Sequence, residues 1–238
     1  MYHRRTNNFW RIMFAQLVVG CLILSVAFGI IYYAQGYRFN YRNFRIIKTG
    51  IVNVTSTPRD AEVFVDGKIK SKKTPYYVNL TAGPHTVSIK KEGYYDWQTT
   101  YMVEAEMVNV SKNILLIKNN ISPQVLTDTK KLAALHAPVD MLAKKLSNDL
   151  SYSDYEIWVE DDLIARFSTP ISHVVWLPDY AHIVYQQGNQ IRVIEASGQN
   201  DTLLIEMKNS NITNIVFGEK YTEMYYTDGD VDMVAVIR

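Results

Sequence analysis

The sequence predicts a mainly β protein that is carried on one N-terminal transmembrane helix. We expect a small β-sandwich after the helix, followed by an incomplete β-propeller-like repeat segment. Three observations support this fold class. A long uncharged apolar run lies near the N-terminus, apolar and polar residues alternate with a period of two from Gly50 onward, and the C-terminal half contains an internal repeat. A period of two is typical of strands that are buried on one face.

The composition allows a packed core and argues against nucleic acid as a partner. The chain has 238 residues, of which 47% are apolar. Residues 1–48 contain seven basic and no acidic residues, and the remainder carries 18 basic and 24 acidic residues, a net charge of −6. A mildly acidic body lacks the basic surface that phosphate backbones require. The basic N-terminal end instead fits a membrane segment with its flanks.

The apolar run has the length of a membrane span. No charged residue occurs from Ile12 to Tyr37, and the 22 residues Ile12–Tyr33 are almost wholly apolar. At about 1.5 Å per residue, such a helix crosses the roughly 30 Å hydrocarbon core. We expect a short cytoplasmic tail at 1–11, a transmembrane helix at 12–34 and a basic juxtamembrane linker at 35–49.

Two other N-terminal signals remain open. Ser25-Val26-Ala27 resembles the cleavage site of a signal peptide, although the apolar region of such a peptide is about 7–15 residues long. Val18-Val19-Gly20-Cys21 resembles a lipoprotein signal, although apolar residues follow the cysteine. Cys21 is the only cysteine, so an intramolecular disulfide is excluded. An exported protein without disulfides favours a prokaryotic source.

Orientation is less constrained than membrane insertion, because basic residues flank the helix on both sides. The positive-inside rule therefore does not decide between the two orientations. A short N-terminal tail before a long C-terminal body favours a body outside the cytoplasm. We expect a single-pass protein of the cell membrane with an extracytoplasmic body.

Residues 50–118 alternate as short antiparallel strands do. The strands are separated by turn sequences, of which Asp66-Gly67 is the strongest hairpin signal. The motifs in this segment resemble a PEGA domain over roughly residues 50–100. They are Gly50-Ile51-Val52-Asn53-Val54, Thr57-Pro58, Ala61 through Lys68, Thr74-Pro75, Leu80, Ala82 through Val87, and Glu92-Gly93-Tyr94.

The PEGA resemblance implies a small β-sandwich of prokaryotic envelope proteins, without catalysis and without a named ligand. The namesake tetrapeptide departs from the family pattern and reads Thr81-Ala82-Gly83-Pro84 here. Within this segment Tyr94, Tyr95 and Trp97 are the candidate ligand-binding residues, because aromatic ring faces stack on sugar rings. The alternative is that Trp97 and one tyrosine fill the end of the sandwich as core residues.

A linker is expected at 119–124, and residues 125–238 contain the repeat. Ile171 through Trp176 align with Ile212 through Phe217 at an offset of 41, which also aligns Gly188 with Gly229. A period of about 40–45 residues with several short strands is typical of a propeller blade. This half resembles TolB-type and WD-repeat propellers, although the WD dipeptide is absent.

The number of repeats leaves the form of this segment open. A closed propeller needs about 4–8 blades, and the sequence offers two with a weaker third around residues 152–159. The last repeat ends at Arg238 with an expected open edge. The chain is therefore a fragment of a longer protein, an oligomer that closes the ring, or an open β-meander. Residues 125–150 are either short helices broken by Pro138 or a degenerate blade.

No catalytic pattern occurs in the sequence. The only cysteine lies in the apolar run, and the motifs of serine hydrolases, metalloproteases and phosphate-binding loops are absent. His173 and His182 could lie on neighbouring strands, but no third metal ligand accompanies them. Asp228-Gly229-Asp230 has the spacing of a calcium loop but aligns with a plain turn of the repeat. We therefore expect no enzyme, no metal and no cofactor.

These observations predict a membrane-anchored binding or scaffold protein of the cell envelope. The expected partners are the lipid bilayer and wall or surface polysaccharide. The alternative partner is another protein in an envelope assembly, which would bind to open strand edges.

Overall fold

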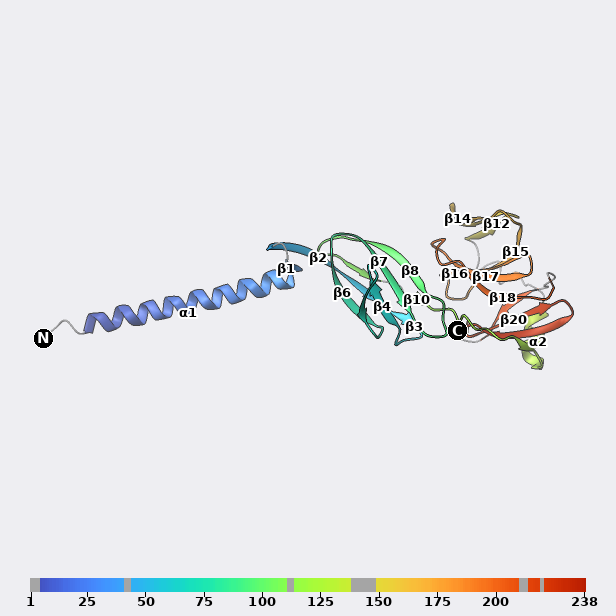
Figure 1. Ribbon diagram of the computed structural model, residues 1–238, viewed down its shortest axis with the longest axis horizontal. Helices are drawn as coiled ribbons and strands as arrows, with labels where there is room; N and C mark the ends of the chain where they lie inside the picture. The colour runs from blue at the N-terminus through green and yellow to red at the C-terminus, as the bar shows by residue number, and fades with distance from the viewer. Residues whose placement is uncertain (1–4, 41–43, 111–113, 138–148, 210–213, 219–220) are drawn as a thin grey trace. The chain divides into compact units, whose positions relative to one another are not determined.

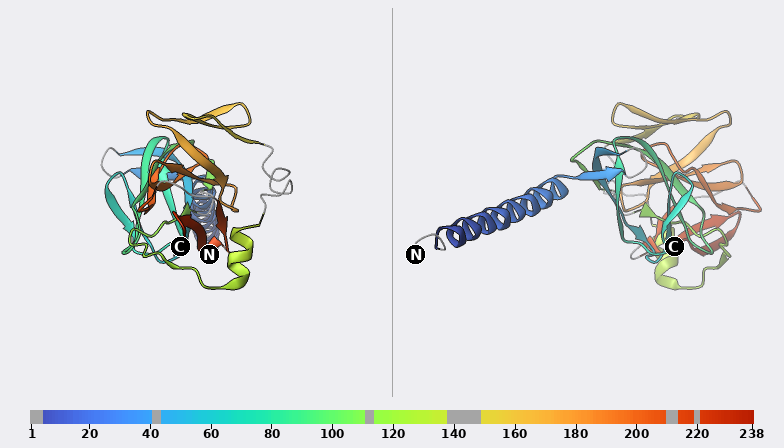
Figure 2. Two further views of the ribbon diagram at one scale, coloured as in Figure 1. Left: turned by 90° about the vertical axis from the view of Figure 1, so that its right-hand side faces the viewer. Right: turned by 60° about the vertical axis from the view of Figure 1, so that its left-hand side comes forward.

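A computed structural model describes residues 5–40, 44–110, 114–137, 149–209, 214–218 and 221–238. The protein is mainly β, with one long helix (Figures 1 and 2). The chain forms two compact units, and each is described here on its own. Unit 1 comprises residues 1–54, 76–85 and 100–112, and unit 2 comprises residues 55–75, 86–99 and 113–238.

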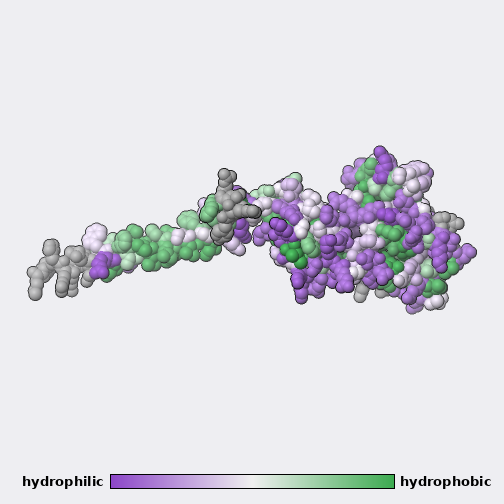
Figure 3. Space-filling view, in the orientation of Figure 1, coloured by the Kyte–Doolittle hydropathy of each residue, from purple (hydrophilic) through white to green (hydrophobic). Residues whose placement is uncertain are grey.

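Unit 1 begins with the helix α1 (Arg5–Ala34). Its segment Phe9–Ala34 is long and apolar enough to cross a membrane, and none of it is buried within the protein. At about 1.5 Å per residue the 26 residues exceed the thickness of the hydrocarbon core. A signal sequence near the N-terminus has the same properties. Figure 3 shows the continuous hydrophobic surface of this helix.

The helix ends in a tight turn that leads directly into a sheet. The N–H of Gly36 donates to the carbonyl O of Tyr33 (3.2 Å), and Gly36 has a φ of +84°, which favours glycine. The carbonyl O of Gly36 then accepts from both the backbone N (3.1 Å) and the Oγ1 (2.8 Å) of Thr49. The turn therefore fixes the start of the sheet against the end of the helix.

The sheet of unit 1 is built around one long strand, β2 (Arg45–Val54). Its order is β1-β2-β6, and β9 also pairs with β2, in parallel. The expected linker at 35–49 is largely strand, because Phe39 and Ile46 lie opposite each other in the β1–β2 hairpin. The other strands are β1 (Tyr37–Asn40), β6 (Tyr76–Thr81) and β9 (Val108–Val110).

A second sheet has the order β5-β4-β7-β8, and β4, β5 and residues 86–90 and 97–99 of it belong to unit 2. Alternate residues on β4 are buried, with Val63 and Val65 inside, as the alternation predicts. Asp66 and Gly67 form the turn between β4 and β5 with φ values of +50° and +74°, which confirms the predicted hairpin. The strands are β4 (Glu62–Val65), β5 (Lys68–Ser71), β7 (Gly83–Lys90) and β8 (Trp97–Val103). A parallel pair, β3 (Ser56–Thr57) and β10 (Ile114–Leu115), completes this part.

Three further antiparallel sheets follow in unit 2. One has the order β12-β13-β14, the next β15-β16-β17-β18, and the last β11-β21-β20-β19. The first two consist of β12 (Leu150–Tyr152), β13 (Glu156–Val159), β14 (Asp162–Arg166), β15 (Ile171–Trp176), β16 (His182–Gln187), β17 (Gln190–Glu195) and β18 (Thr202–Glu206). The last consists of β11 (Gln124–Val125), β19 (Ile215–Phe217), β20 (Glu223–Asp228) and β21 (Val231–Val236).

The last two sheets share one backbone pattern at an offset of 41 residues. β16 and β17 have the same bounds as β20 and β21 after that shift. The N–H of Leu177 donates to the carbonyl O of His182, and the N–H of Gly218 donates to that of Glu223 in the same way. Tyr180 and Tyr221 both have a positive φ. The likeness to propeller blades stays a prediction.

The open edge expected for the last repeat is paired in the structure. β11 pairs with β21 and adds a fourth strand, and Gln124 at the end of the expected linker belongs to it. Residues 125–150 are expected to form either short helices or a degenerate blade. The structure contains a short helix in this segment, α2 (Thr129–Leu135). The carboxylate of Asp128 caps α2 by accepting from the N–H groups of Lys130 and Lys131. Pro138 and the following residues to 148 lie outside the described residues.

We expect Gly50→Ala to destabilise the fold. Gly50 is buried on β2, and a Cβ there would lie 2.8 Å from Cγ1 of Val103 and 3.1 Å from the carbonyl O of Met107. Such overpacking costs about 1–3 kcal/mol of unfolding free energy. Denaturant unfolding of the full chain in detergent measures the loss. Asn79→Ala, at an exposed position of β6, is the matched control and should change stability little. Equal midpoints for both variants would contradict the prediction.

Candidate binding site

Trp97, the central residue of the predicted binding group, is buried at the start of β8. Only 7% of its surface is exposed. Its indole Nε1–H donates to the carboxylate of Glu195, at the end of β17. A ring that is enclosed in this way presents no open face to a sugar. Burial with the N–H paired is instead the usual arrangement of a core tryptophan.

Further polar contacts surround the indole. The Oγ1 of Thr99 donates to Oε1 of Gln199 (2.7 Å), and the backbone N of Gln98 donates to Oδ1 of Asn200 (3.3 Å). Asn200 also donates from Nδ2 to Oε1 of Glu195 (3.1 Å). The start of β8 is thus bonded to the loop that follows β17. We name this set of contacts the Trp97 clasp.

The two tyrosines are half-buried. Tyr95 packs against the largest apolar cluster of unit 2, and its backbone N donates to the carbonyl O of Ile117 (2.9 Å). Tyr94 forms an isolated antiparallel bridge with Lys118. The cavity beside Tyr95 and Trp97 has a volume of only about 20 Å³, which is room for a single water. The structure brings the three predicted residues together, but it gives them no saccharide-sized opening.

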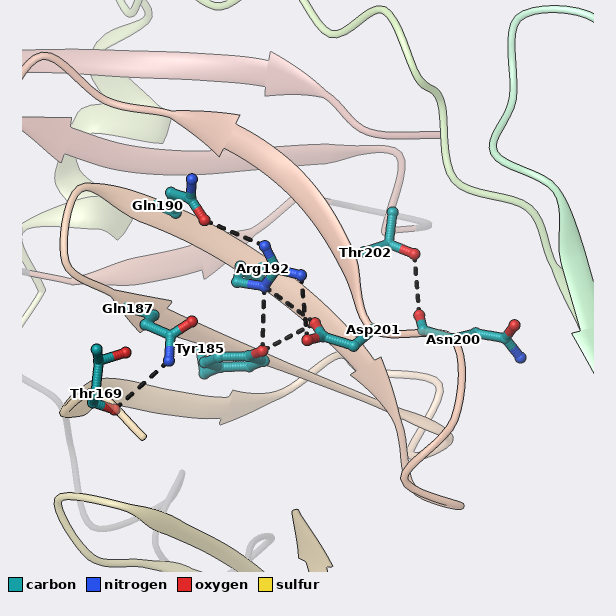
Figure 4. A network of polar contacts seen from close by, with 8 residues as sticks. All are labelled: Thr169, Tyr185, Gln187, Gln190, Arg192, Asn200, Asp201 and Thr202. Carbon is teal, nitrogen blue, oxygen red and sulfur yellow. Dashed lines mark hydrogen bonds and ion pairs between the residues drawn. The ribbon is translucent and has the colours of Figure 1, made fainter. Parts of the chain in front are cut away.

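A partly buried polar network connects strands of the β15–β18 sheet (Figure 4). The hydroxyl of Tyr185 donates to Oδ1 of Asp201 (2.8 Å), and Arg192 donates from Nη2 to Oδ2 of the same carboxylate (3.1 Å). Burial raises the pKa of the Tyr185 phenol, so the hydroxyl stays a donor at neutral pH. The network ties β16, β17 and the residue before β18 together. Sequence reasoning did not find it, because its members are neither adjacent nor part of a motif.

Lys131, Glu223 and Asp228 make contacts that stabilise the fold. Lys131 on α2 donates to Glu223 on β20 (2.7 Å), and this hydrogen bond lowers the pKa of Glu223. Asp228 accepts from the backbone N of Lys208 (3.0 Å) and of Asn209 (2.8 Å), which is the role of a turn residue. The acidic turn that resembled a calcium loop is thus a turn between two strands.

No metal-binding group comes together in the described part of the chain, where no three His, Cys, Asp or Glu side chains approach one another suitably. His182 instead bonds Asp179 (2.7 Å), and His173 bonds Ser172 (3.2 Å). The expected absence of a metal or cofactor stays a prediction.

Exposed apolar side chains occur instead on the β12–β14 sheet. Tyr152, Tyr155 and Leu163 are all exposed, and they lie on β12, on the turn that follows it and on β14. We name these three residues the β12–β14 patch. Local sequence patterns do not mark these residues as exposed, because the same residue types also fill strand cores.

The described residues form an apolar helix and mainly antiparallel β-sheets, as the sequence predicts. Comparison with protein families agrees for part of the chain. Residues 49–116 match the PEGA domain family. This match includes Gly50, both Thr-Pro pairs and the candidate residues Tyr94, Tyr95 and Trp97, and it confirms that part of the resemblance. No curated protein matches the chain.

We expect Trp97→Ala to act on stability. Removal of a buried tryptophan costs about 3–5 kcal/mol of unfolding free energy. Tyr77→Ala, at an exposed aromatic position of β6, should cost within about 0.5 kcal/mol. Denaturant unfolding of the full chain in detergent compares the two. A Trp97→Ala variant as stable as the wild type would show that the indole has no core role and would restore the sugar-binding interpretation.

Proposed function

We propose that the protein is a single-pass scaffold of the cell envelope, whose extracytoplasmic β-rich body binds another protein without catalysing a reaction. The helix α1 supports membrane attachment by its length and composition. The PEGA match supports the location of the body, because PEGA domains are usually extracytoplasmic.

Burial of Trp97 is the observation that favours a protein partner over a polysaccharide. Polysaccharide binding was predicted from aromatic rings that would stack on sugars, and the central ring of that group is enclosed in the Trp97 clasp. What the surface offers instead is the β12–β14 patch. Its two exposed tyrosines, Tyr152 and Tyr155, are typical of protein interfaces, where tyrosine is enriched.

The strand arrangement adds a second reason. β14 lies at the end of the order β12-β13-β14 and carries the exposed Leu163. Edge strands offer backbone donors and acceptors that an extended segment of a partner can use. By contrast, β5 at the edge of another sheet carries Lys68 and Lys70, which discourage such pairing.

Photocrosslinking in the cells that make the protein tests this proposal. A photoreactive amino acid in place of Tyr155 should give a discrete adduct with another protein, because the residue lies in the patch. The same amino acid in place of Ile69, which is similarly exposed on the lysine-bearing edge strand β5, is the matched control and should give none.

Two results would contradict a protein partner. One is equal crosslinking from both positions, which would indicate random collisions. The other is the absence of adducts together with retention of the wild-type protein on purified wall material, which would favour polysaccharide.

A further inference from the structure

We propose that the β1–β2 hairpin is a second membrane-contact element, which inserts its apolar tip into the headgroup layer beside the end of α1. The lipid surface is its partner. This inference rests on the membrane attachment in the proposed function, but it does not depend on which face of the membrane the body occupies.

Three apolar side chains on the described residues beside the turn of this hairpin are open to solvent, and they form its apolar tip. Phe39 is 46%, Phe44 80% and Ile46 65% exposed. Phe39 and Ile46 are cross-strand partners and therefore share one face of the hairpin. Phe39 and Phe44 make an edge-to-face contact with ring centroids 6.1 Å apart. Three large apolar side chains are thus grouped within eight positions of the chain, Phe39 to Ile46.

Contacts within unit 1 hold the hairpin against the end of the helix. The guanidinium of Arg38 lies 3.8 Å from the ring centroid of Tyr33, and its Nη1 donates to the carbonyl O of Tyr33 (2.7 Å). Tyr32 and Tyr37 make an edge-to-face contact at 5.3 Å. Figure 1 shows β1 and the start of β2 at the C-terminal end of α1. These contacts join the hairpin to residues that mark the membrane interface in a spanning helix.

The distances fit the headgroup layer. The bilayer is about 40–45 Å thick including its interfacial regions, against about 30 Å of hydrocarbon. The apolar helix segment ends at Ala34, and β1 starts at Tyr37. A strand advances about 3.3 Å per residue, so Phe39 lies within roughly 7 Å of Tyr37, which matches the roughly 5–7 Å depth of one headgroup layer.

The charge of the hairpin segment also favours the lipid surface as its partner. Arg38, Arg42 and Arg45 lie in the hairpin sequence, and residues 1–48 contain no acid. The nearby Glu106 is neutralised by Lys48, with Nζ and Oε1 2.7 Å apart. Basic residues next to a membrane segment are attracted to lipid phosphates.

A second exposed apolar pair lies at the same end of the sheet. Met107 and Val108 are both exposed, and they line a recess of about 350 Å³ together with Ala34 and Gly36. The N–H of Ile51 on β2 donates to the carbonyl O of Met107 (2.9 Å), which fixes this pair to the strand. Met107 and Val108 therefore add exposed apolar surface beside the helix end, where a membrane surface would cover it.

Site-directed spin labelling tests the inference on the full chain, reconstituted in vesicles of phosphatidylcholine and phosphatidylglycerol. The label at the native Cys21, exposed on α1, reports the depth of the helix. Cys21→Ser with Phe44→Cys places it at the hairpin tip, and Cys21→Ser with Ile69→Cys places it on β5 as a solvent control. For each label we compare two collision rates. One is with oxygen, which concentrates in lipid, and the other is with a water-soluble nickel chelate.

We expect the Phe44→Cys label to be several-fold more accessible to oxygen, relative to the chelate, than the Ile69→Cys label. Adding Phe39→Asp to the Phe44→Cys variant should abolish that difference. A Phe44→Cys label that matches the Ile69→Cys control, while Cys21 stays lipid-like, would overturn the inference and leave membrane attachment intact. A Cys21 label that is also water-accessible would overturn membrane attachment itself.

Discussion

The carbonyl oxygen of Gly36 is the point on which unit 1 depends. It accepts two hydrogen bonds from Thr49, one from the backbone and one from the hydroxyl, and so joins the end of α1 to the middle of β2. β2 in turn carries β1, β6 and β9. Any other residue at position 36 would have to adopt a φ of +84°, which L-residues rarely do. Its Cβ would lie 3.0 Å from the carbonyl O of Thr49. A residue without a Cβ is therefore required where the chain changes from helix to sheet.

This junction determines how the helix is connected to the first sheet. An apolar helix alone attaches a protein to a membrane but leaves the body free to turn about a linker. Here the segment after the helix is already strand, and Arg38 and Tyr37 contact the last helical turns. The first sheet therefore starts directly at the C-terminal end of the helix, with only residues 35 and 36 between them.

Local patterns in the sequence predicted a large part of the fold. Alternation located β2, β4, β7 and β9, and Asp66-Gly67 located a hairpin, because both signals depend only on neighbouring residues. The β1–β2 hairpin was missed because arginines interrupt its apolar residues. β11 was missed because a strand of two residues has no period to detect.

The candidate site was harder to predict, because the decisive contact joins residues far apart in the sequence. Trp97 is a predicted binding residue, but its hydrogen-bond partner in the structure is Glu195, and no local pattern connects the two. Tyrosine and tryptophan suit both a core and a binding surface, since each combines an apolar ring with a polar group. Only the contacts that exclude water from the indole separate these roles. The same limit explains why the β12–β14 patch was not anticipated.

The central claim is that an intact α1 holds the β-rich body on the outer side of the membrane. The most direct measurement is labelling of Ile69→Cys, in a Cys21→Ser background, with a membrane-impermeant maleimide in intact cells. Ile69 is exposed on β5, so the reagent can reach it wherever the body is accessible. We predict that the full-length, membrane-bound chain is labelled as fully before lysis as after it. Labelling that appears only after lysis would place the body in the cytoplasm and contradict the account.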